Sequence, residues 1–237
     1  MPNILYTDHD IIVAVKKAGL LSENGNEANS FHARLSAYLR EQGQNDAIFT
    51  VHRLDRDVGG VMVYARTKYA AARLSAQIAC HGFEKEYLTL VHGRPEKNSS
   101  TLTDLLFRDK AKNKTYIVTR MRHGVKEASL EYKSLAGYDD NTLIFVKLIT
   151  GRTHQIRVQF ASRHNPVLGD RRYGAPDGPG EIHLWSYRVS FIHPVSDKRV
   201  VFCSLPDWNI PLNDAIRAEL DKPYDAISPM QDKSNRT

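Results

Sequence analysis

Short β-branched apolar segments follow one another along this chain with few helices between them, and this succession limits the fold more than any other feature. Two of them, "IIVAV" (11–15) and "VMVYA" (61–65), have the composition of buried strands. Because strands succeed one another directly, we expect an α+β fold with a mixed, mostly antiparallel central sheet. Five later segments are also expected to be strands. The first three should form an antiparallel meander and the last two a closing hairpin: "YIVTRMR", "EASLEYKSLAGY", "TLIFVKLIT", "LWSYRVSFIHP" and "RVVFCSLP".

Helical spacing is confined to a few short segments that flank these strands. Ser30 and Thr67 are the predicted N-caps of the first two, and Gly43 suits the position after the end of the first. A third helix is expected after a turn at Gly151. The three segments are "SFHARLSAYLREQG", "TKYAAARLSAQIA" and "GRTHQIRVQFASRH".

The chain has 237 residues, of which 41% are hydrophobic and 25% charged, as in soluble globular proteins. We expect one domain over 1–210 and a C-terminal helix and tail over 211–237, with a disordered end. Cys80 and Cys203 have no metal-binding spacing, which indicates two reduced, partly buried thiols. No signal peptide or membrane-spanning run is present in the sequence, so we expect a cytoplasmic protein.

Basic residues are clustered rather than spread, on a net charge of +6. The segment from Arg108 to Lys126 holds Asp109 as its single acid. Clustered lysine and arginine neutralise phosphates and release counterions, so the segment suits nucleic-acid binding. A solvated basic face is the alternative for either cluster taken alone. The second cluster consists of Arg152, Arg157, Arg163, Arg171 and Arg172.

The stretch "HRLDRDVGG" (52–60) concentrates charge directly before an apolar strand. Asp55 and Asp57 would share one face of an extended segment, and paired carboxylates suit acid–base chemistry or a metal. Basic residues flank both positions and no third acid is clustered with them, which argues against a metal-dependent nuclease. An aspartate flanked by arginines is expected to stay ionised and to act as an anion or nucleophile.

Two further segments carry residues that could serve a site. His154 is either a catalytic base or a histidine bound to backbone at a helix start. Arg152 and Arg157 are five positions apart, so they do not quite share a helix face. Tyr87, in "FEKEYLTLVHG", is either a core aromatic or a stacking partner for a base. No GxxxxGK, GxGxxG or GxSxG motif is present, and we expect no nucleotide cofactor.

The order of these motifs resembles the RluA-type family of RNA pseudouridine synthases. The resemblance extends from about Asn3 to Pro206. "HRLDRDVGG" is similar to the family's HRLDxxTSG, and "KEYLTLVHG" to its KxYxAxVxG strand. "TGRTHQIRVQFASRHNPVLGDRRYG" resembles GRTHQIRxH…GHPxxGDxxYG almost word for word. "ILYTDHDIIVAVKKAGLL" resembles the family's opening strand and lysine-containing loop, and "LWSYRVSFIHP" its last strand pair.

The resemblance implies the pseudouridine synthase catalytic fold, with flanking helices and loops and an active-site cleft across the sheet. It implies isomerisation of a uridine in RNA to pseudouridine with neither cofactor nor metal. Asp55 matches the catalytic aspartate, Tyr87 the tyrosine that stacks on the target base, and Arg157 the arginine that pairs with that aspartate. Arg53 matches the arginine that takes the place of the flipped nucleotide. Asp57 matches no functional position.

The chain departs from the family pattern at a few positions. Val58-Gly59-Gly60 replaces Thr-Ser-Gly, which removes two hydroxyls and predicts a looser loop. Lys17 stands where proline is usual, and Gln159 where histidine is frequent. The altered Val58-Gly59-Gly60 motivates one alternative, a catalytically weak or inactive RNA-binding or RNA-folding protein on the same fold.

The expected partner is a structured loop of ribosomal or transfer RNA, bound by a monomer without membrane attachment. The chain begins at the catalytic domain, so we expect no separate N-terminal RNA-binding domain and expect the catalytic domain to hold the RNA. The predicted RNA-binding residues are Arg53, His52, Arg152, His154, Lys110, Lys112 and Lys114.

Overall fold

The computed structural model describes residues 1–23, 30–174, 180–208 and 212–223. It divides into two compact units: unit 1 comprises Met1–Glu86 and Trp185–Pro206, and unit 2 comprises Tyr87–Leu184 and Asp207–Thr237. The predicted domain boundary at residue 210 stays a prediction. The end of the chain expected to be disordered, from residue 224 on, lies outside the described residues.

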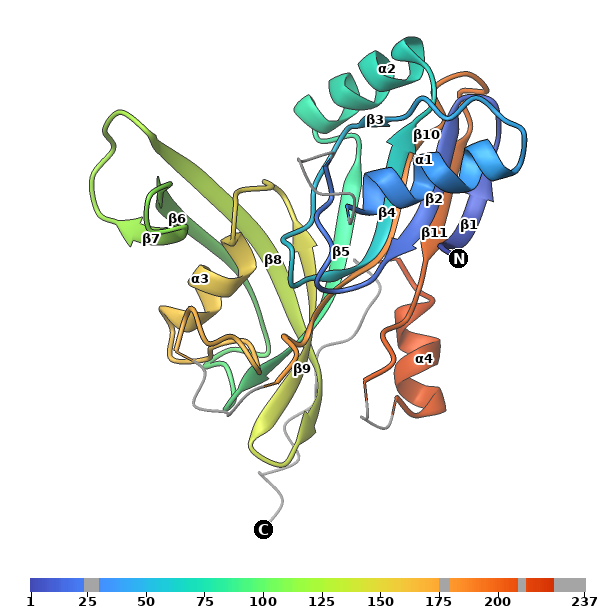
Figure 1. The fold of residues 1–237 in the computed structure, drawn as a ribbon. Coiled ribbons are helices and arrows are strands. Elements are labelled where there is room, and N and C mark those ends of the chain that lie inside the picture. Colours follow the sequence, from blue (N-terminus) through green and yellow to red (C-terminus); the bar gives the residue numbers. More distant parts are fainter. Residues whose placement is uncertain (24–29, 175–179, 209–211, 224–237) are drawn as a thin grey trace. The chain divides into compact units, whose positions relative to one another are not determined.

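Unit 1 is built on a sheet with the strand order β1-β2-β4-β10-β11 (Figure 1). The short strand β3 (Phe49–Thr50) also pairs with β4. The β4–β10 pairing is parallel, and the other pairings are antiparallel, so the predicted mixed, mostly antiparallel sheet is confirmed. The bounds are β1 Asn3–Thr7, β2 Ile11–Lys16, β4 Gly59–Ala65, β10 Leu184–Ile192 and β11 Arg199–Cys203.

Two helices, α1 (Phe31–Glu41) and α2 (Lys68–Ala79), pack on this sheet with the predicted caps. The hydroxyl of Ser30 accepts a hydrogen bond from the Ala33 N–H, and that of Thr67 accepts one from the Ala70 N–H. Gly43 has a φ of +66°, a left-handed conformation in which glycine is favoured after a helix. Helix spacing and caps were therefore predicted correctly from local sequence.

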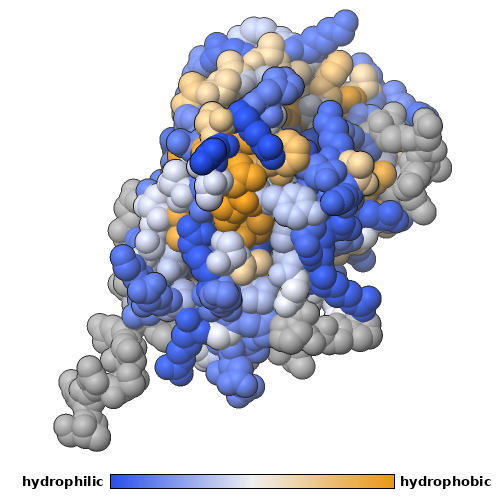
Figure 2. Space-filling model, turned by 90° about the vertical axis from the view of Figure 1, so that its left-hand side faces the viewer, coloured by the Kyte–Doolittle hydropathy of each residue, from blue (hydrophilic) through white to orange (hydrophobic). Residues whose placement is uncertain are grey.

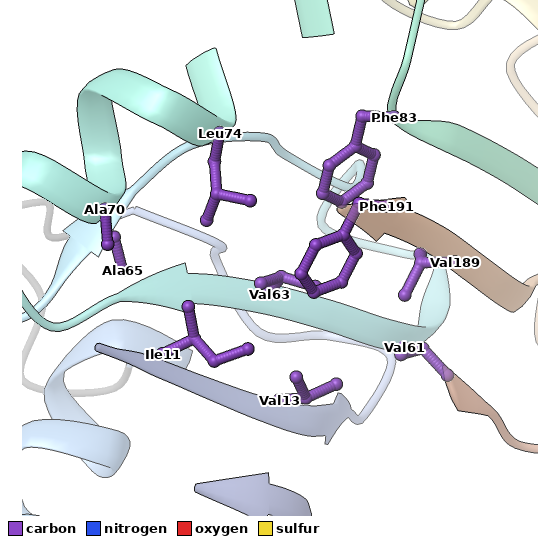
Figure 3. Packing of buried hydrophobic residues seen from close by; sticks show 10 residues of the cluster. All are labelled: Ile11, Val13, Val61, Val63, Ala65, Ala70, Leu74, Phe83, Val189 and Phe191. Carbon is purple, nitrogen blue, oxygen red and sulfur yellow. The ribbon is translucent and has the colours of Figure 1, made fainter. Parts of the chain in front are cut away.

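The hydrophobic core of unit 1 lies between α2 and one face of the sheet (Figure 3). The Phe83 and Phe191 rings stack with centroids 5.0 Å apart, at an interplanar angle of 4°. Alternation along β2 and β4 sends every second side chain to this face and its neighbours to the opposite one. The buried members of the cluster are Ile11, Val13, Val61, Val63, Ala65, Ala70, Leu74, Phe83, Val189 and Phe191.

Unit 2 contains a second run of strands with the order β5-β9-β8-β6-β7 (Figure 1). The predicted three-strand meander is confirmed for β8 and β9, which pair antiparallel. It is wrong for β7, because β6 lies between β7 and β8 and pairs with both. No strand was expected at β6, whose sequence mixes apolar and polar residues. The bounds are β5 Glu84–His92, β6 Ser99–Asp109, β7 Lys114–Val118, β8 Val125–Tyr138 and β9 Asn141–Leu148.

Two short helices complete unit 2, α3 (Gln155–Ala161) and α4 (Asp214–Leu220). Among the described residues, no helix is long and apolar enough to cross a membrane. Cys80 and Cys203 are both exposed free thiols, so the expectation that they are partly buried is wrong.

Candidate active site

The two aspartates of the charged turn before β4 differ in their exposure to solvent. Asp55 is half-buried, whereas Asp57 is exposed. The Asp55 carbonyl accepts a hydrogen bond of 3.1 Å from the Val58 N–H, which closes a tight turn. Leu54 and Val58, on either side, are buried and anchor the turn in unit 1. The chain therefore holds Asp55 at the edge of the interior and leaves Asp57 in solvent.

A buried cation, Lys16, lies near both carboxylates. Burial lowers the pKa of Lys16 to about 8, while the charges of Asp55 and Asp57 act in the opposite direction. No role was predicted for Lys16 from the sequence. The available signal was a lysine that directly continues the fully apolar strand "IIVAV", where the alternation of the strand places it inside.

His52, predicted to bind RNA, packs inside unit 1. It is 8% exposed, and its Nε2 accepts a hydrogen bond of 3.0 Å from the Val63 N–H. Burial, with a smaller effect of Lys85, lowers its pKa to about 3, so the ring is uncharged. Its ring centroid is 5.2 Å from that of Phe83. A buried neutral ring brings no charge to a phosphate, and the predicted RNA-binding role of His52 stays a prediction.

Arg53 is exposed and forms a long ion pair of 3.3 Å with Glu23. More than half of each side chain is exposed, at 59% and 52%. Pairs of this kind contribute at most about 1 kcal/mol. Arg53 can therefore leave its position at little cost, as an arginine that enters an RNA helix would have to.

Residues 58–60 do not form the looser loop that the missing hydroxyls predicted. Val58 is 2% exposed, and Gly59 and Gly60 begin β4 as buried strand residues. Gly60 has a φ of +121°, and a Cβ there would lie 2.3 Å from the backbone oxygen of Ser186. The glycine is thus required by close approach of the protein's own β10 backbone, because no other residue fits.

In unit 2, Arg157 forms a buried, bidentate ion pair with Asp170. Its Nε donates to Asp170 Oδ2 at 2.6 Å, and its Nη2 donates to Oδ1 at 2.8 Å. The two side chains are 4% and 0% exposed, so this geometry is rigid. The predicted pairing of Arg157 with Asp55 joins residues of different units and stays a prediction. Asp170 was missed, although it lies in the quoted "GDRRYG" segment.

Tyr173 gathers several predicted site residues of unit 2 around its ring. The guanidinium carbon of Arg157 and Nζ of Lys114 each lie 5.4 Å from the ring centroid. The Tyr173 hydroxyl accepts a hydrogen bond from the Thr115 N–H at 2.8 Å and is 2.9 Å from His154 Nδ1. Burial is the main cause of a raised Tyr173 pKa, so the phenol is neutral. The ring ties β7 to α3.

His154 packs against Tyr173, and its predicted RNA-binding role stays a prediction. It is 8% exposed and adopts a left-handed φ of 56° at the start of α3. Gln155 organises that start, because its Oε1 accepts hydrogen bonds from the Thr150 hydroxyl and the Arg152 N–H. Arg152 is exposed, and its Nε donates to the Glu127 carbonyl at 2.9 Å. Arg152 is therefore the more exposed of these two predicted RNA-binding residues.

Tyr87 lies in β5 and is 6% exposed. Both interpretations made from the sequence, a core aromatic and a base-stacking residue, are compatible with a side chain at this depth. Its role stays a prediction.

The hairpin between β6 and β7 carries the predicted basic surface. Lys110 and Lys112 are exposed in its turn, where the Asp109 carboxylate accepts a hydrogen bond from the Lys112 N–H at 3.0 Å. Arg172 donates to the Asn113 carbonyl at 3.1 Å and holds the turn from outside. Figure 2 shows the face of the molecule that lies on the left in Figure 1, where hydrophilic residues predominate.

Among the described residues, no group of three or more histidine, cysteine, aspartate or glutamate side chains is arranged to hold a metal ion. The acidic residues of the turn, Asp55 and Asp57, are accompanied by lysine and arginine rather than by further carboxylates. The residues around Asp55 thus suit proton transfer or nucleophilic chemistry by a carboxylate.

A family model described as RNA pseudouridylate synthase matches residues 10–162, more than half of the chain. The chain belongs to this family. RNA pseudouridine synthases are isomerases that convert uridine in RNA to pseudouridine, and that is the class of reaction assigned here. The matched range includes Asp55, Tyr87 and Arg157, but the match to the family model does not assign a role to any single residue.

Curated relatives agree with this membership. An uncharacterized RNA pseudouridine synthase of Aquifex aeolicus is 35% identical over 217 residues, which cover 84% of this chain and 68% of the relative. The ribosomal large subunit pseudouridine synthase C of Buchnera aphidicola subsp. Acyrthosiphon pisum is 29% identical over 206 residues, 83% of this chain and 65% of the relative. The chain thus spans about two thirds of the length of these relatives.

Solved structures agree on the fold. Human RNA Pseudouridylate Synthase Domain Containing 4 superimposes with a TM-score of 0.72 at 22% identity, covering 86% of this chain and 89% of that one. Human RNA Pseudouridylate Synthase Domain Containing 1 has the same TM-score and identity and covers 91% of this chain. The predicted pseudouridine synthase fold is confirmed.

Proposed function

We propose that this chain isomerises one or more uridines in a structured loop of ribosomal or transfer RNA, in the cytoplasm, as a monomer. Support for an RNA substrate comes from family membership and from the exposed basic hairpin. The name of one relative refers to the large ribosomal subunit, which favours ribosomal RNA as the first substrate to test.

The reaction moves one bond within the nucleotide. The bond from ribose C1′ to N1 of the base breaks, the base turns, and a bond from C1′ to C5 forms. The hydrogen on C5 leaves as a proton and N1 gains one, so the nucleotide's composition is unchanged. The reaction therefore consumes no oxidant, reductant or other co-reactant. An enzyme has to hold the flipped base and supply one carboxylate.

We assign that carboxylate to Asp55, and this assignment carries the proposal. Asp55 is half-buried on a turn held by buried neighbours, whereas Asp57 is exposed. An ionised Asp55 can attack the ribose, attack the base or remove the 2′ proton, and the three routes stay open. Tyr87 is assigned to stacking on the base and Arg157 to pairing with Asp55. Flipping a base costs a few kcal/mol and is least costly in a loop.

The test compares Asp55→Asn with Asp57→Asn, two substitutions of identical chemistry two positions apart. Release of tritium from RNA labelled at uridine C5 measures turnover, and filter binding measures RNA affinity. We expect Asp55→Asn to lower turnover on the order of 10³-fold or more while affinity is kept, because a catalytic group is lost. Asp57→Asn should behave like the wild type.

Full activity of Asp55→Asn would show that the catalytic assignment is wrong. A large loss in Asp57→Asn would reverse the choice between the two aspartates. Wild-type protein that binds RNA yet releases no tritium from any RNA would favour the RNA-folding alternative. Mapping pseudouridines in total RNA from cells with and without the protein identifies the substrate.

A further inference from the structure

Two aromatic residues, Phe107 and Tyr116, are paired across the β6–β7 hairpin (Figure 1). Paired residues of neighbouring strands project from the same face of a sheet. Tyr116 is exposed, at 36%, and Phe107 is half-buried. Neither residue belongs to the site proposed around Asp55. Aromatic side chains grouped at a surface, unlike single scattered ones, mark interaction sites.

The opposite face of the hairpin is already occupied by the core of unit 2. Leu106 and Ile117 form the next cross-strand pair, and alternation along the strands sends them to that opposite face. There they pack in one cluster with Val158 of α3. The face that carries Phe107 and Tyr116 is therefore the one turned away from α3.

A cation lies over each of the two aromatic rings. The guanidinium carbon of Arg122 is 5.1 Å from the centroid of the Phe107 ring, and Nζ of Lys114 is 5.8 Å from that of the Tyr116 ring. Arg122 is exposed in the turn between β7 and β8, so this turn and the hairpin contribute to one surface. Both rings thus have positive charge beside them.

The acidic residues of this face belong to the residue pairs on either side of the two rings. Asp109 is paired with Lys114, and Glu127 is paired with Leu105. In the sequence, Asp109 is the single acid of the segment from Arg108 to Lys126. The segment that carries the rings is therefore strongly basic, which favours a ligand with phosphate groups.

Aromatic rings beside cations suit single-stranded nucleic acid in particular. A base stacks on an aromatic ring through its own π face, and the neighbouring cations neutralise the phosphates of the strand. In duplex RNA the bases are already stacked inside the helix, so a protein ring cannot stack on them. The expected ligand is therefore an unpaired nucleotide.

We propose that Phe107 and Tyr116 form a second stacking site, for an unpaired nucleotide of the RNA substrate, with Arg122 and Lys114 beside its phosphates. The inference rests on the proposed function, because it requires an RNA substrate. β5, which carries Tyr87, is three strand spacings of about 4.8 Å away from β6 in the sheet. One base cannot span that separation, so the nucleotide at this site is a different one from the target uridine.

The experiment replaces Tyr116 with Leu, which removes the ring and keeps an apolar, uncharged side chain. The matched control is Tyr69→Leu, because Tyr69 is 58% exposed and the guanidinium carbon of Arg73 lies 6.0 Å from its ring centroid. The control thus removes a similar ring with a neighbouring cation from unit 1. Fluorescence anisotropy measures the affinity of each protein for two RNA probes, a hairpin with an unpaired loop and a blunt duplex.

We expect Tyr116→Leu to lose on the order of 10-fold in affinity for the hairpin and to bind the duplex as the wild type does, because only an unpaired base stacks. The slope of log K against log salt should not change, since no charge is removed. Tyr69→Leu should match the wild type on both probes. Tyr116→Phe, which keeps the ring, should recover the affinity that Tyr116→Leu loses.

Three outcomes would overturn the inference. In the first, Tyr116→Leu binds the hairpin as tightly as the wild type. In the second, Tyr116→Leu loses as much affinity for the duplex as for the hairpin, so the ring does not act on an unpaired base. In the third, Tyr69→Leu loses as much affinity as Tyr116→Leu.

The wild-type protein provides a second measurement should Tyr116→Leu not fold. Loop uridines of the probe are replaced by 5-iodouridine, which forms a covalent bond with a stacked aromatic ring under ultraviolet light. Trypsin then separates the tyrosines, since Tyr116 is the only aromatic residue of peptide 115–120, Tyr87 that of 86–97 and Tyr69 that of 69–73. We expect cross-links on 115–120 and none on 69–73. Cross-links on 86–97 alone would overturn the inference.

Tritium release from RNA labelled at uridine C5 tests the proposed function separately. Turnover by the wild type, together with wild-type binding by Tyr116→Leu, would refute the stacking site and keep the function. Loop binding that depends on Tyr116, without tritium release from any RNA, would refute the function and keep the stacking site. The two failures are therefore distinguishable.

Discussion

At the scale of single residues, His52 links the turn before β4 to the core of unit 1. Its Nε2 accepts from the Val63 N–H, and its folded-state pKa is about 3 against an ordinary 6.5. As the pH falls through 6.5, the unfolded chain gains a proton that the folded protein cannot take. Stability is thus present above 6.5 and is lost at roughly 1.4 kcal/mol per pH unit down to about 3.

The variant His52→Gln tests this pH dependence, since an amide oxygen can accept the same hydrogen bond without titrating. Urea unfolding at a series of pH values measures the free energy of unfolding of both proteins. We expect the wild-type value to decline more steeply with acid than that of His52→Gln. Parallel curves would mean that His52 titrates normally and contacts solvent.

Also at the scale of single residues, the pair Gly59 and Trp185 explains one departure of this chain from the family pattern. The two residues face each other across the parallel β4–β10 pairing, and a Cβ on Gly59 would lie 2.4 Å from the Trp185 ring. Trp185 is held by its Nε1, which donates to the Ser204 carbonyl at 2.6 Å. The indole thus occupies the space that the serine of the family pattern would need.

Restoring that serine should therefore harm this chain unless the indole is removed too. We expect Gly59→Ser to destabilise the protein by about 1–3 kcal/mol through overpacking. In Gly59→Ser/Trp185→Ala the serine should cost less than in the wild type, with a coupling of roughly 0.5–3 kcal/mol. Chemical denaturation of the four proteins of the cycle measures it, and strictly additive effects would show that the two positions are independent.

At the scale of elements, the β6–β7 hairpin is expected to bind RNA phosphates. The double change Lys110→Ala/Lys112→Ala removes two exposed charges from its turn. RNA affinity should fall, and the slope of log K against log salt should decrease by roughly one for each phosphate that the variant no longer neutralises. Fluorescence anisotropy at several salt concentrations measures both quantities.

The matched control is Lys68→Ala/Lys198→Ala, which removes the same charge from exposed positions of unit 1. An equal effect of both pairs would indicate a response to net charge rather than a binding hairpin. Lys114 is left out because it contacts the Tyr116 and Tyr173 rings. Its replacement would disturb packing as well as charge.

Elements with a strong local signal were predicted well from the sequence. The caps Ser30 and Thr67 and the apolar spacing behind them act within a few residues, so α1 and α2 were found correctly. β6 was missed because its alternation is weak and its two partners, β7 and β8, both follow it in the chain. Pairing order depends on contacts between distant segments, which local periodicity does not encode.

At the scale of the whole molecule, the sequence motifs identify the family, but they do not show how the chain divides into two units. Residues 185–206 return to unit 1, and β10 pairs there with β4 more than a hundred positions earlier. This return depends on the β4–β10 pairing, which no local pattern of the sequence encodes. Membership in the RNA pseudouridylate synthase family rests on residues 10–162, which include parts of both units.

Motifs and periodicity are local properties, so the family, the α+β class and Asp55 as the carboxylate to test could all be inferred from the sequence. Which charges are buried, and what compensates them, depends instead on tertiary contacts. Arg157 meets Asp170 across thirteen positions, and Lys16 meets the Arg56 carbonyl across forty. Tertiary contacts also bury His52 and His154, since burial depends on what the rest of the chain places over a residue.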